Sequence, residues 1–412
     1  MAGPARGESP AASRTGHGPA AGAAGPLAGL LVVDLTRVLA GPLASMVLGD
    51  LGARVVKVER PGTGDDSRAY GPLRDGRSLY FARVNRGKES VALDLRDDDD
   101  RAVLHALLDR ADVLVENFRP GVMGRLGLGA DDVARRHPRV VYASVSGFGQ
   151  DGPWSQRPAY DAVVQGLSGI MSITGRPDGP PTKPGIPVAD LAGGLFGAIG
   201  VLAALRERDR TGRGGRVDVA MLDATVGLLE SAALHALVDG VTPPRIGDAH
   251  FSIAPFDTFA TADDRVVVCA AHDGLFAALA HALRRPDLLA DPRFATNAGR
   301  HAHREQLTAE LERALAAHGA DHWLEVLEAA GVPCGPVADV STALRSEQVA
   351  ARRMVVRADG LPLPGNPVKS PAWPDPVQRV REPRLDEHGD AWRRELGLPR
   401  GPGTRVRPAP RG

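Results

Sequence analysis

The chain has 412 residues, more than one usual domain of roughly 100–200 residues, so we expect two domains or one large domain with a smaller satellite. Its 50 Lys and Arg balance its 50 Asp and Glu, and this zero net charge argues against a nucleic-acid-binding protein, which normally carries a strongly basic face. With 43% hydrophobic and 24% charged residues, the chain can build a core and is not generally disordered.

The small number of cysteines favours a reducing compartment. Cys269 and Cys334 are too few for a disulfide framework or a cysteine-rich zinc site. Residues 1–26 are mostly Ala, Gly and Pro and predict a disordered tail without a signal peptide, and residues 399–412 predict a second such tail. No uninterrupted apolar run reaches about 18 residues, so we expect no membrane span and a cytoplasmic protein.

In the N-terminal half, short apolar runs alternate with helical segments. We expect strands at 30–35, 54–59, 90–95, 112–116 and 139–145, and helices at 43–51 and 101–110. Continuous runs of Val and Leu are typical of parallel strands that are buried on both faces. The alternation therefore predicts an α/β fold with a mostly parallel sheet covered by helices.

The second half predicts a different arrangement. Helices are expected at 161–173, 190–209 and 224–238, with a short strand at 216–219. The loop 239–254 contains prolines and glycines and suggests a domain boundary. Beyond it, the pattern predicts strands at 256–260 and 266–271, helices at 273–284, 304–318 and 321–330, and a last helix at 389–396. The middle segment is thus a candidate small α+β domain.

Two familiar site patterns fail closer inspection. Residues 147–152 match G-x-G-x-x-G after a predicted strand, but Pro153 and Pro158 follow and no acidic residue lies near position 170, so we predict a glycine-rich turn rather than a dinucleotide site. No H-E-x-x-H motif occurs, and His301 and His303 have no nearby partner, so no metal site is predicted.

Basic residues gather near the predicted carboxyl ends of strands, where open parallel sheets bind ligands. They are Arg37, Lys57, Arg60, Arg68, Arg86, Lys88, Arg119 and Arg125. Such a set can hold a small phosphorylated ligand, and the alternative is ordinary solvated surface charge.

Asp190 is the most informative carboxylate. It follows a loop broken by prolines and stands where an N-cap would begin the helix. A helix N-terminus favours the ionised form, and Gly193 and Gly194 would allow a ligand to approach the backbone closely. Asp190 is therefore either a simple cap or a nucleophile.

Nine ordered segments carry a family resemblance. They include DLTRVLAGP at 34–42, GARVVKVERP at 52–61 and VENFRPG at 115–121, and the others lie at 64–66, 85–88, 147–153, 159–161, 188–190 and 211–214. Together they resemble the family III CoA-transferases, which include formyl-CoA transferases, carnitine CoA-transferases and the related α-methylacyl-CoA racemases. The resemblance covers roughly residues 27–398.

The resemblance implies an interlocked homodimer in which each chain has a Rossmann-like large domain and a smaller α+β domain. The large domain would comprise residues 27–244 and a returning segment, 336–398, and the small domain residues 245–335. It also implies a mechanism that uses CoA as a substrate and needs no metal or permanently bound cofactor.

In that implied mechanism, Asp190 attacks the acyl-CoA thioester and passes through a mixed anhydride and an aspartyl-CoA thioester. The CoA-contacting positions implied by the resemblance are Ala40, Arg60, Asn117, Phe118 and Arg125. The candidate substrate-pocket residues are Leu39, Tyr160, Asp161 and His250.

Departures from the family pattern bear on the substrate. Leu39 replaces a glutamine of the formyl-CoA transferases, and residues 247–256 lack their glycine-rich flap. The stretch looks more like the succinyl-CoA:glutarate and hydroxymethylglutarate transferases, so we expect a dicarboxylate acceptor rather than formyl or oxalate substrates.

Two other functions are weighed against CoA transfer. A racemase needs an acid/base pair, and Tyr160 stands where the racemases have a histidine; a phenol with a pKa near 10 in model peptides is a poor base. A non-catalytic acyl-CoA-binding paralogue would be expected to lack the nucleophile, yet Asp190 is present.

Overall fold

The structure is a computed structural model that describes residues 25–373 and 378–399. Most of the two predicted disordered tails, 1–26 and 399–412, lies outside these residues. The chain divides into two compact units, which are described separately. The first unit contains the described residues of 1–145, 194–218 and 356–412, and the second contains 146–193 and 219–355.

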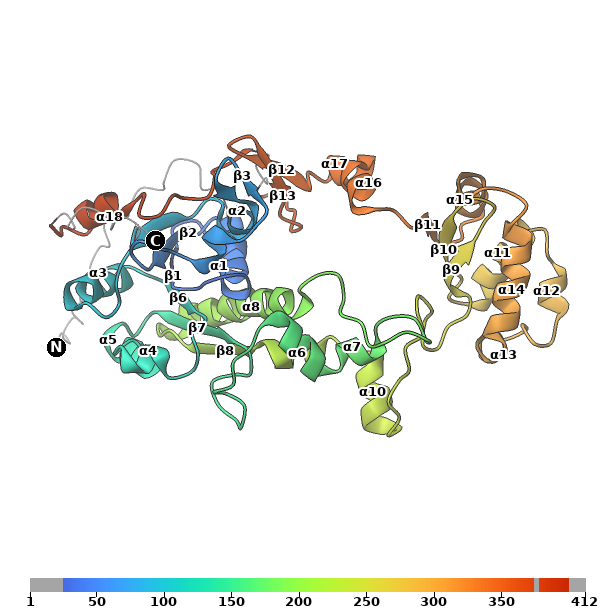
Figure 1. Cartoon of the computed structure of the whole chain (residues 1–412), viewed down its shortest axis with the longest axis horizontal. Helices are drawn as coiled ribbons and strands as arrows, with labels where there is room; N and C mark the ends of the chain where they lie inside the picture. The colour runs from blue at the N-terminus through green and yellow to red at the C-terminus, as the bar shows by residue number, and fades with distance from the viewer. Residues whose placement is uncertain (1–24, 374–377, 400–412) are drawn as a thin grey trace, which may run out of the picture. The chain divides into compact units, whose positions relative to one another are not determined.

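The first unit is built on a six-stranded sheet with the order β5-β2-β1-β6-β7-β8 (Figure 1). The strands are β1 (Leu31–Asp34), β2 (Arg54–Glu59), β5 (Glu89–Ala92), β6 (Val113–Glu116), β7 (Val141–Ser146) and β8 (Arg216–Ala220). The pairs β1–β2, β1–β6, β2–β5 and β6–β7 are all parallel. The predicted parallel sheet is therefore confirmed, and the order places β1 and β6 at its centre.

Helices and short hairpins complete the first unit. The helices are α1 (Ala40–Asp50), η1 (Asp66–Ala69), α2 (Leu79–Asn85), α3 (Asp98–Leu108), α4 (Val122–Arg125), α5 (Ala130–Arg136), the greater part of α8 (Val188–Thr211), and α18 (Gly389–Glu395). The short strands are β3 (Leu73–Arg74), β4 (Arg77–Ser78), β12 (Val355–Ala358), β13 (Leu361–Pro364) and β14 (Gln378–Arg379).

The central strands β1 and β6 are apolar up to their last residues, Asp34 and Glu116, because both faces of the sheet are covered. One core cluster joins Val33 of β1 to Leu104 of α3 and Trp392 of α18. Another joins Val32 of β1 to Leu48 of α1 and to α8. Adjacent strand residues thus enter different cores, which explains the absence of polar alternation.

The C-terminal helix belongs to the first unit. Trp392 is only 1% exposed, and the Arg54 guanidinium lies 4.0 Å from the centre of its ring. Arg54 is also paired with Glu89 and Glu395. The predicted helix at 389–396 is confirmed, and it returns the end of the chain to the sheet formed by its beginning.

Helix α8 begins at Val188, two residues before the predicted N-cap. A Cβ on Gly194 would lie 2.6 Å from the carbonyl oxygen of Ala40, so this glycine serves close packing of α8 against α1 rather than ligand approach.

Among the described residues, α8 is the one unbent helix that is long and apolar enough to cross a membrane, judged by length and composition alone. Two further helices would pass the same test together, but they are bent by 88°. Val201 and Leu205 of α8 lie in a core cluster under the sheet, as expected of a core helix.

The second unit contains a three-stranded antiparallel sheet with the order β11-β10-β9. Its strands are β9 (Phe256–Ala260), β10 (Arg265–Cys269) and β11 (Cys334–Pro336). Its helices are α6 (Asp161–Ser168), α7 (Ile170–Ile173), α9 (Met221–Gly227), α10 (Ser231–Val238), α11 (Asp273–Ala282), α12 (Asp287–Ala290), α13 (Asn297–Ala302), α14 (Arg304–Leu315), α15 (Ala320–Ala329), α16 (Val340–Arg345) and α17 (Glu347–Ala351).

One hydrophobic core of the second unit draws its buried residues only from 254–332, and helices α11–α15 gather about its sheet (Figure 1). The two compact units differ from the predicted domains. Residues 146–193 and 219–244 were predicted to belong to the large domain, but they group with the second unit. The predicted bounds 27–244, 245–335 and 336–398 stay a prediction about domains.

Candidate functional site

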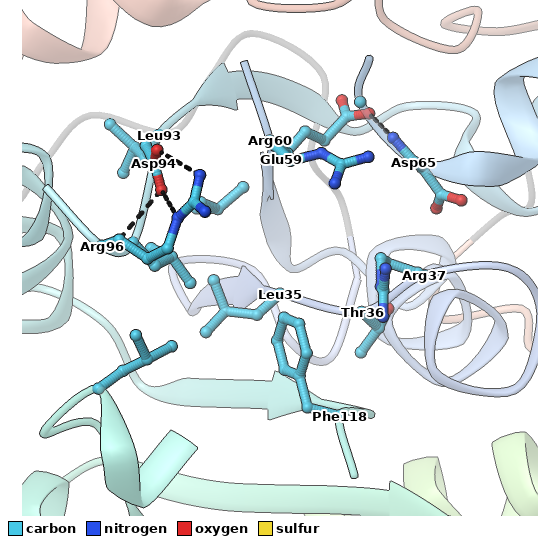
Figure 2. A pocket seen from close by; sticks show the side chains of 14 residues that line it. Leu35, Thr36, Arg37, Glu59, Arg60, Asp65, Leu93, Asp94, Arg96 and Phe118 are labelled. Atoms are coloured by element: carbon cyan, nitrogen blue, oxygen red, sulfur yellow. Dashed lines mark hydrogen bonds and ion pairs between the residues drawn. The ribbon is translucent and has the colours of Figure 1, made fainter. Parts of the chain in front are cut away.

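A cavity of about 290 Å³ opens at the carboxyl ends of β1, β2, β5 and β6. Its lining residues are Leu35, Thr36, Arg37, Val58, Glu59, Arg60, Gly64, Asp65, Leu93, Asp94, Leu95, Arg96, Phe118 and Leu126 (Figure 2). All of them belong to the first unit, and this is the edge of a parallel sheet at which ligands bind.

The cavity combines apolar walls with guanidinium groups. Leu35 and Phe118 supply apolar surface, and the Arg37 guanidinium lies 5.3 Å from the centre of the Phe118 ring. Arg60 donates from Nε to Thr63 Oγ1 at 2.9 Å, and Arg96 is paired with Asp94 (Figure 2). An apolar slot bordered by exposed arginines suits a ligand that is part aromatic or aliphatic and part phosphate.

Five of the eight basic residues that suggested a phosphate site are held in ion pairs. Arg37 makes an exposed pair with Asp66 at 3.4 Å, and the other four lie closer to their carboxylates. Their pairs are Lys57–Asp65, Lys88–Asp34, Arg86–Asp50 and Arg68–Glu59, at 2.5–2.9 Å. The two lysines are at most 1% exposed, so their ammonium groups stabilise the strand ends and cannot reach a ligand.

Burial and ion pairing act in opposite directions on the pKa values of Lys88 and Asp34. Burial lowers the pKa of Lys88 to about 8, although the Asp34 carboxylate opposes that change. Burial disfavours the ionised form of Asp34, but Lys88 and Lys57 outweigh it and hold the pKa of Asp34 well below its usual range.

The predicted CoA contacts are only partly gathered at the cavity. Arg60 and Phe118 line it. Ala40 is buried as the first residue of α1, and Arg125 is exposed at the end of α4, one residue before the lining residue Leu126. Asn117 follows β6, with both polar ends of its side chain bonded to the peptide groups of Arg37.

Arg96 and Leu93 are lining residues that the sequence reasoning missed. Both follow β5, just as Arg60 follows β2. A search of every predicted strand end for basic residues would have found Arg96, because parallel strands end at one edge of the sheet.

Asp190 and Asp161 are brought together in the second unit. Asp161 Oδ1 accepts the N–H of Ala189 at 2.9 Å and that of Asp190 at 3.4 Å. Gln165 Nε2 donates to Asp161 Oδ2 at 2.6 Å. Asp161 therefore satisfies the start of α8, and the expectation that Asp190 is the N-cap is wrong because Asp190 already lies within the first turn.

The electrostatics at Asp190 also differ from the expectation. Burial first, and the like charge of Asp161 second, raise the pKa of Asp190 to about 7. The prediction that the helix N-terminus keeps Asp190 ionised is therefore wrong, because burial and the Asp161 charge both favour the protonated form. At neutral pH Asp190 is a basic carboxylate that is about half ionised.

The remaining substrate-pocket candidates occupy different surroundings. Leu39 is 2% exposed and precedes α1, whereas Tyr160 is 72% exposed and precedes α6. His250 Nδ1 accepts the N–H of Ser252 at 3.1 Å, which assigns the proton of the neutral ring to Nε2.

No group of three or more His, Cys, Asp or Glu among the described residues could hold a metal ion. Cys269 and Cys334 are free, half-buried residues of β10 and β11.

Comparison with protein-family models assigns residues 27–389 to "CoA-transferase family III". The chain belongs to CoA-transferase family III. It is 50% identical over 376 residues to the acetyl-CoA:oxalate CoA-transferase of Acetobacter aceti, with 91% of this chain and 97% of that protein covered. It is also 39% identical to the succinyl-CoA:mesaconate CoA-transferase of Haloarcula marismortui, with 92% and 98% covered.

Solved structures agree with this assignment. A CAIB/BAIF family protein from Brucella suis superposes with a TM-score of 0.81 at 39% identity, and 90% of this chain and 99% of that chain are covered. Rv3272 from M. tuberculosis gives a TM-score of 0.82 at 35% identity, with the same coverage. The enzyme class and the α/β fold are thus those of a family III CoA-transferase.

Proposed function

We propose that this enzyme transfers CoA from an acyl-CoA donor to a dicarboxylic acid, with Asp190 as the nucleophile. The observation that carries the proposal is the environment of Asp190, which combines burial, the neighbouring Asp161 charge and a raised pKa. A carboxylate that is destabilised in this way is more basic and more nucleophilic than an exposed one.

The transfer divides into four exchanges at the Asp190 carboxyl group. Its oxygen attacks the thioester carbonyl, the C–S bond breaks, and a mixed anhydride and CoA thiolate form. The thiolate attacks the Asp190 carbonyl and releases the donor carboxylate, which leaves an aspartyl-CoA thioester. The acceptor carboxylate displaces the thiolate to form a second anhydride, and the thiolate attacks the acceptor carbonyl and regenerates Asp190. Burial excludes water, which would hydrolyse either anhydride.

We assign the CoA nucleotide to the cavity in the first unit. Arg60 and Arg96 suit the phosphate groups, and Leu35 and Phe118 suit the adenine ring and the start of the pantetheine arm. Ala40 and Arg125 are kept as further CoA contacts, and Leu39, Tyr160 and His250 as residues of the acyl pocket.

The relatives favour a short dicarboxylate acceptor. Proteins at 50%, 40% and 39% identity are named for oxalate, glutarate and mesaconate. We therefore include oxalate, which the flap comparison disfavoured, in the acceptor class.

We further propose that the enzyme acts as a homodimer. Leu195, Phe196 and Ile199 of α8 are 42–58% exposed, and Leu234 and Leu237 of α10 are 60% and 82% exposed. Exposed apolar side chains of this kind mark interaction surfaces, and a second copy of the chain is the partner that we propose.

The decisive experiment combines transfer assays with trapping of the intermediate. Wild-type protein is incubated with acetyl-CoA or succinyl-CoA and with oxalate, glutarate or mesaconate, and hydroxylamine should convert Asp190 to a hydroxamate that mass spectrometry detects. Asp190→Asn should lose at least about 10³-fold in kcat and show no hydroxamate. Full CoA transfer by Asp190→Asn would refute the mechanism, and deuterium wash-in at the acyl α-carbon without transfer would indicate a racemase.

A further inference from the structure

The turn between β1 and α1, residues Thr36–Leu39, is held at three successive backbone positions. It carries Arg37 on the cavity wall and leads to Ala40 at the start of α1. Lys57 Nζ donates to the carbonyl oxygen of Thr36 at 2.7 Å. Side chains from two other segments hold the two residues in the middle of the turn, Arg37 and Val38.

Asn117 holds Arg37 from both sides of its peptide. The N–H of Arg37 donates to Asn117 Oδ1 at 2.8 Å, and Asn117 Nδ2 donates to the carbonyl oxygen of Arg37 at 2.8 Å. Both polar ends of Asn117 thus face the turn. These two bonds use one acceptor and one donor of the amide, and together they orient the backbone that Asn117 grips.

Asp65 holds the next residue, whose conformation is unfavourable. The N–H of Val38 donates to Asp65 Oδ1 and Oδ2 at 3.1 and 3.3 Å, and Asp65 is in turn paired with Lys57 at 2.9 Å. Val38 has a φ of 68°, in the left-handed region that β-branched residues rarely adopt. A strained residue persists only where its surroundings over-determine it, as they do here.

We propose that Asn117 is a positioning residue that holds the strained turn Thr36–Leu39 for CoA binding, together with Asp65 and Lys57, rather than a CoA contact. The proposal rests on the proposed CoA function, since the turn presents Arg37 to the cavity. When Asn117 loses its amide, Val38 draws the turn towards ordinary negative φ and Arg37 leaves its place beside Phe118.

A double-mutant cycle tests the proposal, because glycine adopts a positive φ without strain. Wild type, Asn117→Ala, Val38→Gly and the double variant are compared by KM for acyl-CoA, kcat, the dissociation constant of free CoA by calorimetry, and urea unfolding. We expect Asn117→Ala to raise KM about tenfold in the wild-type background and about threefold or less in the Val38→Gly background, with kcat changed less than about twofold. Asn117→Asp, which keeps the acceptor for Arg37 N–H, should raise KM less than Asn117→Ala.

Asn366→Ala is the matched control. It removes a similar bond, from the N–H of Val368 to Asn366 Oδ1 at 2.9 Å, outside the cavity. It should lower the unfolding midpoint and leave KM unchanged.

Two other results of this cycle would overturn the proposal, and a third would overturn the proposed function. Equal increases in KM in the wild-type and Val38→Gly backgrounds would identify Asn117 as a direct CoA contact and overturn the proposal. If urea unfolding shows that Asn117 and Val38 are coupled while KM and CoA affinity stay unchanged, the role of Asn117 is purely structural, and the proposal is also overturned. If wild type neither binds nor transfers CoA, the proposed function fails, and the unfolding cycle still reports whether Asn117 and Val38 are coupled.

Discussion

Replacement of Asp161 by Asn should shift the acid limb of the pH–rate profile to lower pH. The pKa of Asp190 is raised from 3.8 to about 7, which corresponds to about 4 kcal/mol at roughly 1.36 kcal/mol per pKa unit. Burial is the larger cause and the charge of Asp161 the smaller. Asp161→Asn should therefore lower the pKa of Asp190 and leave it above the model-peptide value, because burial remains.

This change has a definite kinetic signature. At pH 6 only about one tenth of Asp190 is ionised in the wild type, so the transfer rate of Asp161→Asn should increase there, by at most about tenfold. At pH 8 Asp190 is nearly fully ionised in both enzymes, and the variant should transfer CoA no faster than the wild type, because its carboxylate is less basic. The assay is the initial rate of CoA transfer from pH 5 to 9, with saturating substrates.

The asparagine is accommodated by the surrounding structure. It keeps an oxygen for the N–H groups of Ala189 and Asp190, and Gln165 can rotate its amide to accept from the new Nδ2. Gln165 Oε1 is buried and finds no hydrogen-bond partner among the described residues. Asp161→Ala, by contrast, should lower kcat at every pH because it removes the cap of α8.

A stability measurement provides an independent check. Because the folded protein binds the Asp190 proton up to about pH 7 and the unfolded chain only to about pH 4, the contribution of Asp190 to the free energy of unfolding falls as pH rises between these values. Asp161→Asn should reduce this slope. Asp178→Asn is the control, since that carboxyl group is 84% exposed and its removal should shift nothing. An acid limb that stays in place or moves to higher pH in Asp161→Asn would refute the reasoning.

The remaining predictions concern stability. A Cβ on Gly214 would lie 2.0 Å from the carbonyl oxygen of Val140, so Gly214→Ala should destabilise the fold by about 2 kcal/mol or more in urea unfolding, and a loss below about 0.5 kcal/mol would contradict this. His137 is nearly buried and bonded to Asp109 and His105, and burial lowers the pKa values of both histidines. The unfolded chain therefore binds more protons at these histidines below about pH 6.5, and their contribution to the free energy of unfolding should fall as pH drops from there. His137→Gln should remove part of this contribution in urea titrations at pH 5–7, and a pH dependence identical to that of the wild type would refute the assignment.

Continuous apolar runs were sufficient to predict the central sheet. The segments 31–34, 54–59 and 113–116 are buried on both faces, and that environment selects Val and Leu at most positions. The buried charges of the second segment, Lys57 and Glu59, are held in ion pairs. The predicted ends of helices were less accurate where two helices follow each other closely. The predicted helix 224–238 is two helices, α9 and α10, because Leu228–Glu230 interrupt it and Glu230 has a φ of 49°.

The sequence by itself therefore determined the α/β class, the family and the candidate nucleophile, because ordered motifs and strand patterns are local properties of the chain. Only the tertiary structure decided which charges can reach a ligand. Lys57 and Arg60 both lie at the end of one strand, yet Lys57 is 0% exposed against Asp65 and Arg60 borders the cavity. Likewise, Asp190 acquires its raised pKa from burial and from Asp161, a residue 29 positions away in the sequence. Electrostatic energies depend on distance and on access to water, and folding sets both of these quantities.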